Sequence, residues 1–247
     1  MTRSRGQSGE ASIAATVGIA VLGVVVLAGT VLGWMNFNDG VESATAGVKP
    51  LPTETASTPV EPPVAVFFGD SYFNGSEFTT KDQSYGTLAG QRAGYQPVIA
   101  GAGGTGFVGD LSPDKVGNYP AQIASDGLPD VNDPALVVIE GGLNDVGQDP
   151  KAVQASAEKV LDKAGKAYPT ATVVLVGPVD PNGDYADTAP ITAALHRAGD
   201  AAGVTFIDPS KWLAGVSGAI GGDGVHPTPK GSKVLAAKLV PLLPQAG

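Results

Sequence analysis

Cysteine is absent from this 247-residue chain. Its absence excludes a disulfide-stapled scaffold, a thiolate nucleophile and any cysteine-based metal site. Basic residues are also scarce. The chain has 15 lysines and arginines and 24 aspartates and glutamates, so its formal net charge is −9. Binding to a phosphate backbone needs clustered lysine and arginine, so we expect no nucleic acid partner. Histidine occurs twice, which leaves few candidates for a general base near neutral pH.

Charge is missing altogether from residues 11–35, a run dominated by Val, Ala, Leu, Ile and Gly. A helix needs about 20 apolar residues to cross a bilayer, whereas the apolar part of a secretory signal peptide has roughly 7–15. We therefore expect a transmembrane helix that acts as an uncleaved signal anchor. Arg3 and Arg5 precede the run and the next basic residue is Lys49, so the positive-inside rule predicts a cytoplasmic N-terminus and an extracytoplasmic remainder.

The expected anchor divides the chain into a cytoplasmic segment (residues 1–10), the membrane helix, a linker (36–62) and a folded domain (63–247). Prolines in the linker alternate with Thr, Ser, Glu and Ala, a composition typical of an extended, semi-rigid spacer. The alternative is secretion after signal cleavage. Ala-Thr-Ala at residues 44–46 offers a cleavage site, but it lies well beyond the apolar run.

Short β-branched runs alternate with longer amphipathic stretches from residue 63 onward. The expected strands are residues 64–68, 97–100, 136–140, 172–176 and 204–207. The expected helices are residues 84–93, 150–167, 189–201 and 229–239. Apolar strands separated by helices predict an α/β domain with a five-stranded parallel sheet that is covered on both faces. In such a sheet, sites form at the carboxyl ends of the strands.

Four segments that can carry chemistry follow the expected strands. They are Gly-Asp-Ser at residues 69–71, a glycine-rich run at 101–106, Gly-Gly-Leu-Asn-Asp at 141–145 and Asp-Gly-Val-His-Pro at 223–227. Each of them alone is an ordinary turn or helix cap. All four, in this order and at the strand ends of one sheet, indicate a shared site.

Acyl transfer is the chemistry that these segments could assemble. A serine hydroxyl needs a base to remove its proton, and histidine is suited to that task near neutral pH. His226 lies in the last segment, where Asp223 can fix its tautomer, whereas His196 falls within an expected helix and is expected at the surface. Glycine N–H groups and the side chain of Asn144 could stabilise the oxyanion that forms. Ser71 is then the candidate nucleophile.

The four segments resemble the four sequence blocks of the SGNH (GDSL) hydrolase family of esterases and lipases, and they span nearly all of residues 63–247. The resemblance implies a flavodoxin-like, three-layer α/β/α fold. It implies a catalytic triad of Ser71, His226 and Asp223. It also implies an oxyanion hole formed by the N–H groups of Ser71 and Gly104 and by the Asn144 side chain.

Two positions of the motifs need comment: the glycine that donates to the oxyanion hole and the residue after the candidate nucleophile. Gly103 is a near neighbour of Gly104, so either N–H could enter the oxyanion hole. Tyr72 stands where the family's name implies leucine. This departure puts the identity of the substrate in question more than the chemistry of the reaction. Tyr72, Phe107 and Trp212 lie beside the motifs or in the loop before the candidate histidine. Together they are our candidates for lining an apolar acyl site, although for any one of them alone packing in the core is the favoured alternative.

The resemblance implies hydrolysis of carboxylic (acyl or acetyl) esters through an acyl-enzyme, and the expected anchor puts this activity on the outer side of the membrane. No cofactor is implied. No metal is expected, because no cluster of histidines or carboxylates has ligand spacing. The expected partners are a small-molecule, glycan or lipid ester and the membrane that holds the N-terminal helix.

Three alternatives stay open at this point. An O-acyltransferase would use the same triad and pass the acyl group to a cell-envelope glycan. A catalytically silent binding module is less favoured, because every triad and oxyanion candidate is present. Residues 101–106 also match the dinucleotide-binding pattern G-x-G-x-x-G, but that pattern requires a helix to begin there, and residues 107–113 predict a loop.

Overall fold

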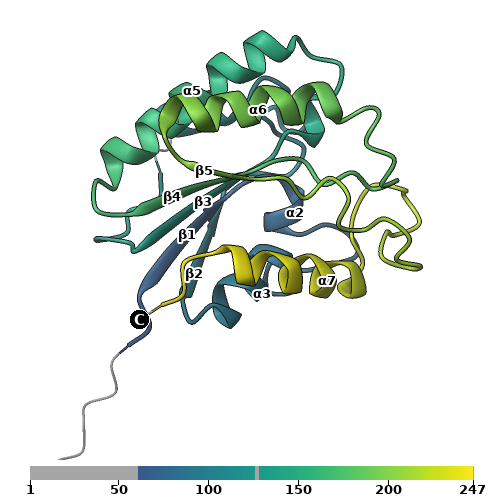
Figure 1. Cartoon of the computed structure of the whole chain (residues 1–247), viewed down its shortest axis with the longest axis horizontal. Helices are drawn as coiled ribbons and strands as arrows, with labels where there is room; N and C mark the ends of the chain where they lie inside the picture. Colours follow the sequence, from purple (N-terminus) through teal and green to yellow (C-terminus); the bar gives the residue numbers. More distant parts are fainter. Residues whose placement is uncertain (1–60, 126–127, 247) are drawn as a thin grey trace, which may run out of the picture. The chain divides into compact units, whose positions relative to one another are not determined.

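The structure is a computed structural model that describes residues 61–125 and 128–246. Its centre is a parallel sheet of five strands in the order β2-β1-β3-β4-β5 (Figure 1). The strands are β1 Val64–Phe68, β2 Gln96–Ala100, β3 Leu136–Glu140, β4 Thr172–Val176 and β5 Thr205–Ile207. The parallel sheet predicted from the sequence is confirmed. β1, β3 and β4 have their expected bounds, and β2 and β5 differ by one residue at their starts.

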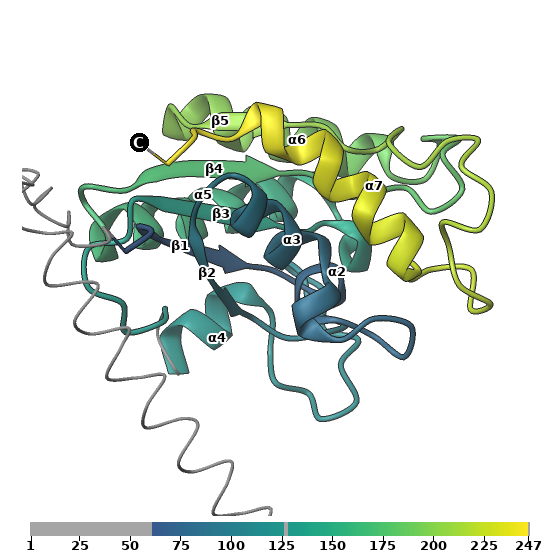
Figure 2. The ribbon, with the colours of Figure 1, turned by 90° about the horizontal axis from the view of Figure 1, so that it is seen from below.

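Helices cover both faces of the sheet, with α3 and α7 on one face and α4, α5 and α6 on the other (Figures 1 and 2). The helices are α2 Ser71–Asn74, α3 Tyr85–Arg92, α4 Tyr119–Ser125, α5 Pro150–Ala167, α6 Ala189–Ala202 and α7 Pro229–Leu239, with short 3-10 turns η1 Lys81–Gln83, η2 Leu143–Asp145 and η3 Val240–Leu242. Successive strand side chains point to opposite faces. Ala65 and Phe67 therefore join the core under α3 and α7, while Val66 and Phe68 join the core under α5 and α6.

β1 is the strand at which the chain changes its direction of travel across the sheet. It pairs with β2 on one side and with β3 on the other, so the chain first moves outward to β2 and then returns past β1 to β3. A doubly wound sheet opens a crevice at such a point, beyond the carboxyl ends of the two strands. Ser71 follows β1 and Asn144 follows β3, so the topology brings both residues to this crevice.

The start of α7 is fixed by a helix cap directly after residues 223–227. The Thr228 hydroxyl accepts the N–H of Gly231 at 3.2 Å. Pro229 occupies the first helical position, where its missing N–H removes no helical hydrogen bond. The cap holds the end of the loop that carries the candidate histidine against the body of the domain.

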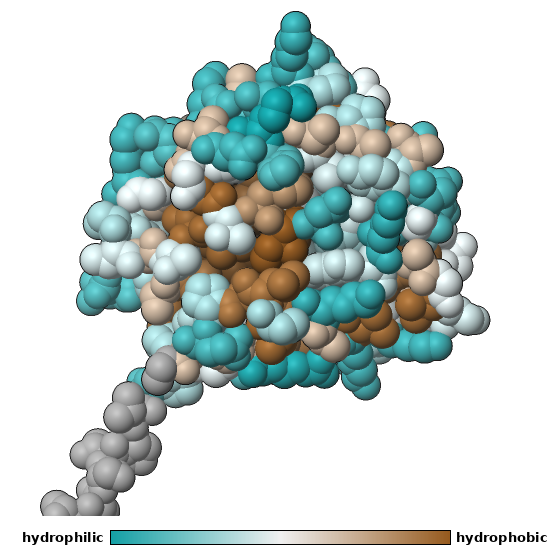
Figure 3. All heavy atoms as spheres, in the orientation of Figure 1, coloured by the Kyte–Doolittle hydropathy of each residue, from teal (hydrophilic) through white to brown (hydrophobic). Residues whose placement is uncertain are grey.

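The β5 end of the sheet is an edge that the helices cover incompletely. Within the described residues β5 pairs with β4 only, and the neighbouring Val204 and Phe206 are partly buried. Figure 3 shows apolar side chains gathered at the surface on this side of the sheet, between α6 and α7. The crevice between β1 and β3 lies at the centre of the sheet, apart from this edge.

The transmembrane helix expected at residues 11–35 and the linker up to residue 60 lie outside the described residues, so both stay predictions. Among residues 61–125 and 128–246, no helix has both the length and the apolar character that crossing a bilayer requires.

Candidate active site

Ser71 is the first residue of α2 and follows β1 through Gly69 and Asp70. Asp70 is fully buried and caps the helix, because its carboxylate accepts the N–H of Tyr72 at 2.9 Å. Gly69 allows the ends of β1 and β3 to approach closely, since a Cβ at this position would lie 2.8 Å from Oε2 of Glu140. The turn therefore presents Ser71 at the sheet edge and fixes it through a buried carboxyl group.

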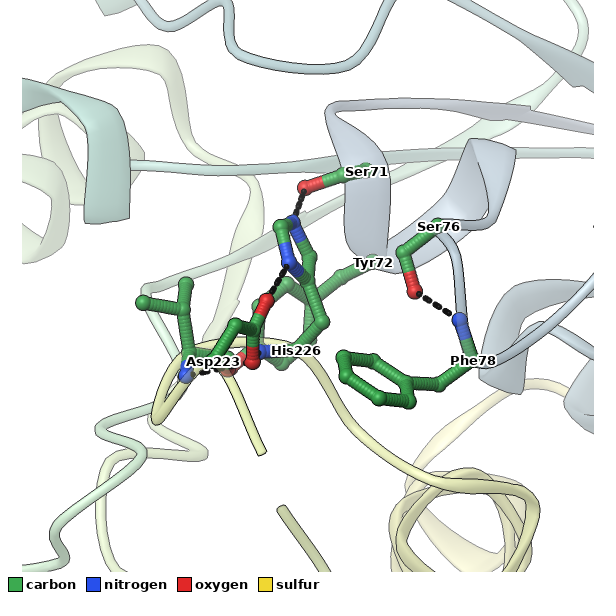
Figure 4. A network of polar contacts seen from close by, with 7 residues as sticks. Ser71, Tyr72, Ser76, Phe78, Asp223 and His226 are labelled. Carbon is green, nitrogen blue, oxygen red and sulfur yellow. Dashed lines mark hydrogen bonds and ion pairs between the residues drawn. The ribbon is translucent and has the colours of Figure 1, made fainter. Parts of the chain in front are cut away.

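Ser71, His226 and Asp223 form a continuous chain of polar contacts (Figure 4). His226 Nε2 lies 2.8 Å from Ser71 Oγ, and His226 Nδ1 lies 2.5 Å from Asp223 Oδ2. An ionised Asp223 accepts the Nδ1–H, which leaves the Nε2 lone pair free to accept the serine proton. The structure thus brings together the three residues that the sequence resemblance nominates as a triad.

Hydrogen bonds favour the ionised form of Asp223. Partial burial raises the pKa of this carboxyl, but hydrogen bonds from the Val225 N–H, the His226 side chain and the His226 N–H outweigh burial and hold the pKa below its ordinary value. The two N–H groups donate to Oδ1 at 3.0 Å each, so Oδ2 is left for the imidazole. Asp223 is therefore charged over the pH range in which a histidine ordinarily titrates.

The glycine-rich loop after β2 lies against Ser71. A Cβ at Gly103 would be 3.5 Å from the Ser71 Cβ, and Gly103 and Gly104 both line the cavity that holds the serine. Gly104 has a φ of 75°, a left-handed conformation that favours glycine. Within the described residues, neither glycine donates its N–H to a protein acceptor. Both N–H groups are thus free to bind an oxyanion, and the choice between them stays open.

The Asn144 side chain lines the same cavity, but its two N–H groups already have acceptors. Nδ2 donates to the Asp70 carboxylate at 3.1 Å and to the Thr105 carbonyl at 2.9 Å. An oxyanion beside Ser71 would have to share one of these N–H groups. The amide therefore connects the nucleophile turn, the glycine-rich loop and the loop after β3 before any substrate binds.

Asp145 holds the glycine-rich loop in place and was not predicted as a site residue. Its fully buried carboxylate accepts the N–H groups of Phe107, Val108 and Gly109 at 2.9, 2.8 and 2.7 Å. A Cβ at Gly106 would overlap this carboxylate. The signal in the sequence is an aspartate beside Asn144 together with glycines that leave room for it in the facing loop.

Two buried carboxyl groups, those of Asp70 and Glu140, adjoin the nucleophile turn. Burial raises the pKa of Asp70 to about 7, against the lowering effect of the hydrogen bonds from the Tyr72 N–H and from Asn144. Burial also raises the pKa of Glu140, and the nearby charge of Asp70 adds to the rise. Oε2 of Glu140 has no hydrogen-bond partner among the described residues. Glu140 was not predicted either, although a glutamate that ends an otherwise apolar strand is a visible signal.

The aromatic residues expected to line the substrate site do not line it, which corrects the sequence-based expectation. Tyr72 and Phe107 are 2% and 0% exposed and pack in the core. Trp212 is partly buried against the core under α3 and α7. The cavity of about 450 Å³ around Ser71 is lined on its apolar side by Pro113, Leu143 and Val225.

A second cavity of about 310 Å³ adjoins the first across Leu143, Asn144 and Val225, which line both. Its apolar rim includes Leu111, which is 66% exposed, and Val146, which is 39% exposed. Small aliphatic side chains, rather than the expected aromatic ones, therefore surround the opening.

His196 and the G-x-G-x-x-G match have no part in this site. His196 lies on the exposed face of α6, where its ring stacks on Phe206 with the ring centroids 5.1 Å apart. Its surface position is as predicted. No helix begins at residues 101–106, since α4 starts only at Tyr119. The helix N-terminus that a dinucleotide pyrophosphate needs is therefore absent at that point.

Comparison with known proteins agrees with this geometry. The model of the GDSL-like Lipase/Acylhydrolase family matches residues 67–234, which include every segment of the site. The chain is also 30% identical over 240 residues to the GDSL lipase Rv0518 of Mycobacterium tuberculosis, covering 92% of this chain and 96% of that protein.

Solved structures share the fold. TesA is similar with a TM-score of 0.54 and 25% identity, over 72% of this chain and 96% of TesA. A family two carbohydrate esterase from Cellvibrio japonicus is similar with a TM-score of 0.61 and 19% identity, over 75% of this chain and 62% of that one. The matches to a family and to a relative along almost the whole chain establish that this protein belongs to the GDSL-like lipase/acylhydrolase family and is an ester hydrolase.

Proposed function

We propose that the protein is a serine esterase in which Ser71 attacks the carbonyl carbon of a carboxylic ester. The observation that carries the proposal is the 2.8 Å separation of Ser71 Oγ and His226 Nε2, with Asp223 Oδ2 2.5 Å from Nδ1. A hydroxyl, a base and an orienting carboxylate in series are what nucleophilic catalysis by serine requires.

In the first half-reaction, His226 accepts the Ser71 proton while Oγ forms a bond to the carbonyl carbon. The carbonyl oxygen becomes an oxyanion, which accepts hydrogen bonds from the N–H groups of Ser71 and Gly104 and from the Asn144 amide. Because both N–H groups of Asn144 are engaged in the free enzyme, one of them is shared with the oxyanion. The bond between the carbonyl carbon and the alcohol oxygen then breaks, and protonated His226 gives its proton to the leaving alcohol.

In the second half-reaction, water takes the place that the alcohol has left. His226 accepts a proton from this water while the water oxygen attacks the acyl carbon of the ester on Ser71. A second oxyanion forms in the same position and collapses, the bond to Ser71 Oγ breaks, and the proton returns to Oγ. The products are a carboxylic acid and the free enzyme.

The cavity favours an ester without negative charge. Glu77 and Asp223 contribute carboxylates to its lining, and no lysine or arginine lies among the described residues that line it. An anionic acyl or alcohol group would therefore meet charge of its own sign. Solved structures of similar fold include a family two carbohydrate esterase, and we propose acylated glycans, with neutral lipid esters second, as substrates.

We further propose that catalysis takes place outside the membrane. The support is the uncharged run at residues 11–35, with basic residues before it and none until Lys49 after it. Protease treatment of intact cells that carry a C-terminally tagged chain tests this proposal. Loss of the tag from intact cells agrees with it, whereas protection of the tag until the membrane is opened contradicts it.

Hydrolysis of p-nitrophenyl acetate tests the esterase proposal. Ser71→Ala is expected to abolish turnover without unfolding the domain. Ser76→Ala is a matched control, because Ser76 lines the same cavity and its hydroxyl accepts the Phe78 N–H at 3.2 Å, away from the imidazole. Undiminished turnover by Ser71→Ala overturns the assignment. Appearance of an acylated sugar when a sugar acceptor is added identifies a transferase instead.

A further inference from the structure

The hydroxyl of Tyr72 donates a hydrogen bond to the carbonyl of Val225 at 2.7 Å. Tyr72 follows Ser71 in α2, and Val225 precedes His226 in the loop before α7. The Tyr72 ring is buried, and its centroid lies 6.3 Å from that of the His226 imidazole. Two positions 153 residues apart in sequence, each adjacent to a member of the proposed triad, are therefore joined directly.

The turn that carries His226, residues 219–228, makes most of its hydrogen bonds within itself. The Gly221 N–H donates to the His226 carbonyl at 2.8 Å, and the Thr228 N–H donates to the Ala219 carbonyl at 2.8 Å. Among the described residues, two hydrogen bonds connect residues 219–227 to the chain before residue 211. One is the Tyr72 hydroxyl bond to Val225, and the other is the contact between Ser71 and His226.

The second of these connections is lost during the proposed reaction. Once Ser71 is acylated, its Oγ is an ester oxygen and has no proton to donate to His226. At this stage His226 must still lie above the acyl carbon to activate water. The Tyr72 hydroxyl bond is then the remaining hydrogen bond between the turn and the nucleophile helix within the described residues.

We infer that Tyr72 is a positioning residue that keeps His226 over the acyl-enzyme during deacylation. The inference rests on the proposed function, because it requires an ester on Ser71. Tyr72 acts through the turn and does not line the cavity that holds Ser71.

The hydroxyl, rather than the ring, carries this role. Tyr72 packs edge-on against Tyr85, with ring centroids 6.4 Å apart, and phenylalanine would preserve that packing. Val225 is 39% exposed, and the turn that carries it lies at the surface of the domain. Tyr72→Phe should therefore change the position of the turn with little effect on the stability of the fold.

Tyr85→Phe is the matched control. Tyr85 is a neighbouring buried tyrosine whose hydroxyl lies near the Glu140 carboxyl group and, among the described residues, makes no hydrogen bond to the turn that carries His226. Both variants lose one buried hydroxyl from the same aromatic cluster, and only Tyr72→Phe loses a contact with the His226 turn. A difference in deacetylation rate between the two variants therefore measures the effect of that contact.

The test separates the two half-reactions of p-nitrophenyl acetate hydrolysis. Rapid mixing measures the first release of nitrophenolate, and acid quenching with intact-mass detection measures decay of the acetyl-enzyme. For Tyr72→Phe we expect acylation near the wild-type rate and deacetylation about three- to tenfold slower, the range for loss of one hydrogen bond. Acetyl-enzyme should accumulate, so kcat and KM fall together. Tyr85→Phe should behave as wild type.

Deacetylation of Tyr72→Phe at the wild-type rate overturns the inference. So does an equal loss in both half-reactions accompanied by a lower Tm, because that pattern indicates a packing role. If wild type itself forms no acetyl-enzyme, the proposed function fails together with the inference. Wild-type turnover that Ser71→Ala abolishes and Tyr72→Phe leaves intact overturns the inference alone.

Discussion

Asn144 donates one side-chain N–H to the carboxylate of Asp70 at 3.1 Å, across 74 positions of sequence. This bond ties the loop after β3 to the residue that caps the nucleophile helix. The other N–H of the same amide reaches the Thr105 carbonyl in the glycine-rich loop at 2.9 Å. The proposed oxyanion donor is therefore oriented before substrate arrives, and such preorganisation is what electrostatic stabilisation of an oxyanion requires.

Asn144→Ala should lower kcat for p-nitrophenyl acetate by about 10²–10³-fold and leave KM nearly unchanged, because the lost interaction strengthens only in the transition state. Asn182→Ala is the control, since Asn182 is exposed and lines the adjoining cavity. Steady-state kinetics of both variants check the prediction. An Asn144→Ala enzyme with kcat near wild type would remove Asn144 from the oxyanion hole.

Asp223→Asn should lower kcat by up to about 10⁴-fold, because the amide can leave the His226 imidazole in the wrong tautomer. An amide oxygen is also a weaker acceptor than a carboxylate for the Val225 and His226 N–H groups, so the Tm is measured in parallel. A folded Asp223→Asn protein with unchanged kcat contradicts the orienting role of this carboxylate.

Asp145→Asn should loosen the glycine-rich loop. An amide oxygen is a weaker acceptor than a carboxylate for the N–H groups of Phe107, Val108 and Gly109. We expect the free energy of unfolding to fall by about 1–3 kcal/mol, the cost of an impaired buried acceptor. Urea titration measures that change, and hydrogen exchange at these three amides locates it. Unchanged exchange at the three amides would show that the carboxylate does not hold the loop.

The buried pair Asp70 and Glu140 should make stability depend on pH. Both folded-state pKa values lie above the ordinary range, that of Asp70 at about 7, so the folded state binds more protons than the unfolded state between about pH 4 and pH 7. Their contribution to stability is complete below about pH 4; that of Asp70 is lost as the pH rises through about 7, and that of Glu140 as the pH rises through its raised pKa.

Glu140→Gln removes one of the two titrating groups at nearly constant shape. The stability of this variant relative to wild type should be higher at pH 8 than at pH 5, as measured by urea unfolding followed by circular dichroism. If the difference in free energy of unfolding between Glu140→Gln and wild type is the same at pH 5 and pH 8, folding does not raise the pKa of Glu140.

The sequence predicted the sheet and the long helices because their apolar residues follow regular periods. α5 and α7 begin and end where expected, and each starts with a proline after a capping residue. α2, with four residues, and α4, with seven, were missed. Helices this short present barely one or two turns of pattern, and tertiary contacts hold them in place.

Within the site, the sequence could indicate Ser71, Asn144, Asp223 and His226, because each polar residue follows an apolar strand or ends a glycine-bounded loop. It could not indicate the Tyr72 contact. That contact joins a hydroxyl to a backbone carbonyl 153 positions away, and no periodicity or spacing encodes such a pair. The same limit explains why Tyr72 was expected at the cavity and lies in the core.

His226 activates Ser71 in the proposed mechanism, and covalent labelling by a fluorophosphonate probe tests this activation most directly, because the probe reacts with an activated serine. Intact-mass measurement and peptide mapping of the wild-type protein should place one adduct on Ser71. His226→Ala should lose the adduct, and His196→Ala, which changes an exposed histidine away from the site, should keep it. An adduct on another residue, or equal labelling of Ser71 in His226→Ala, would contradict the account.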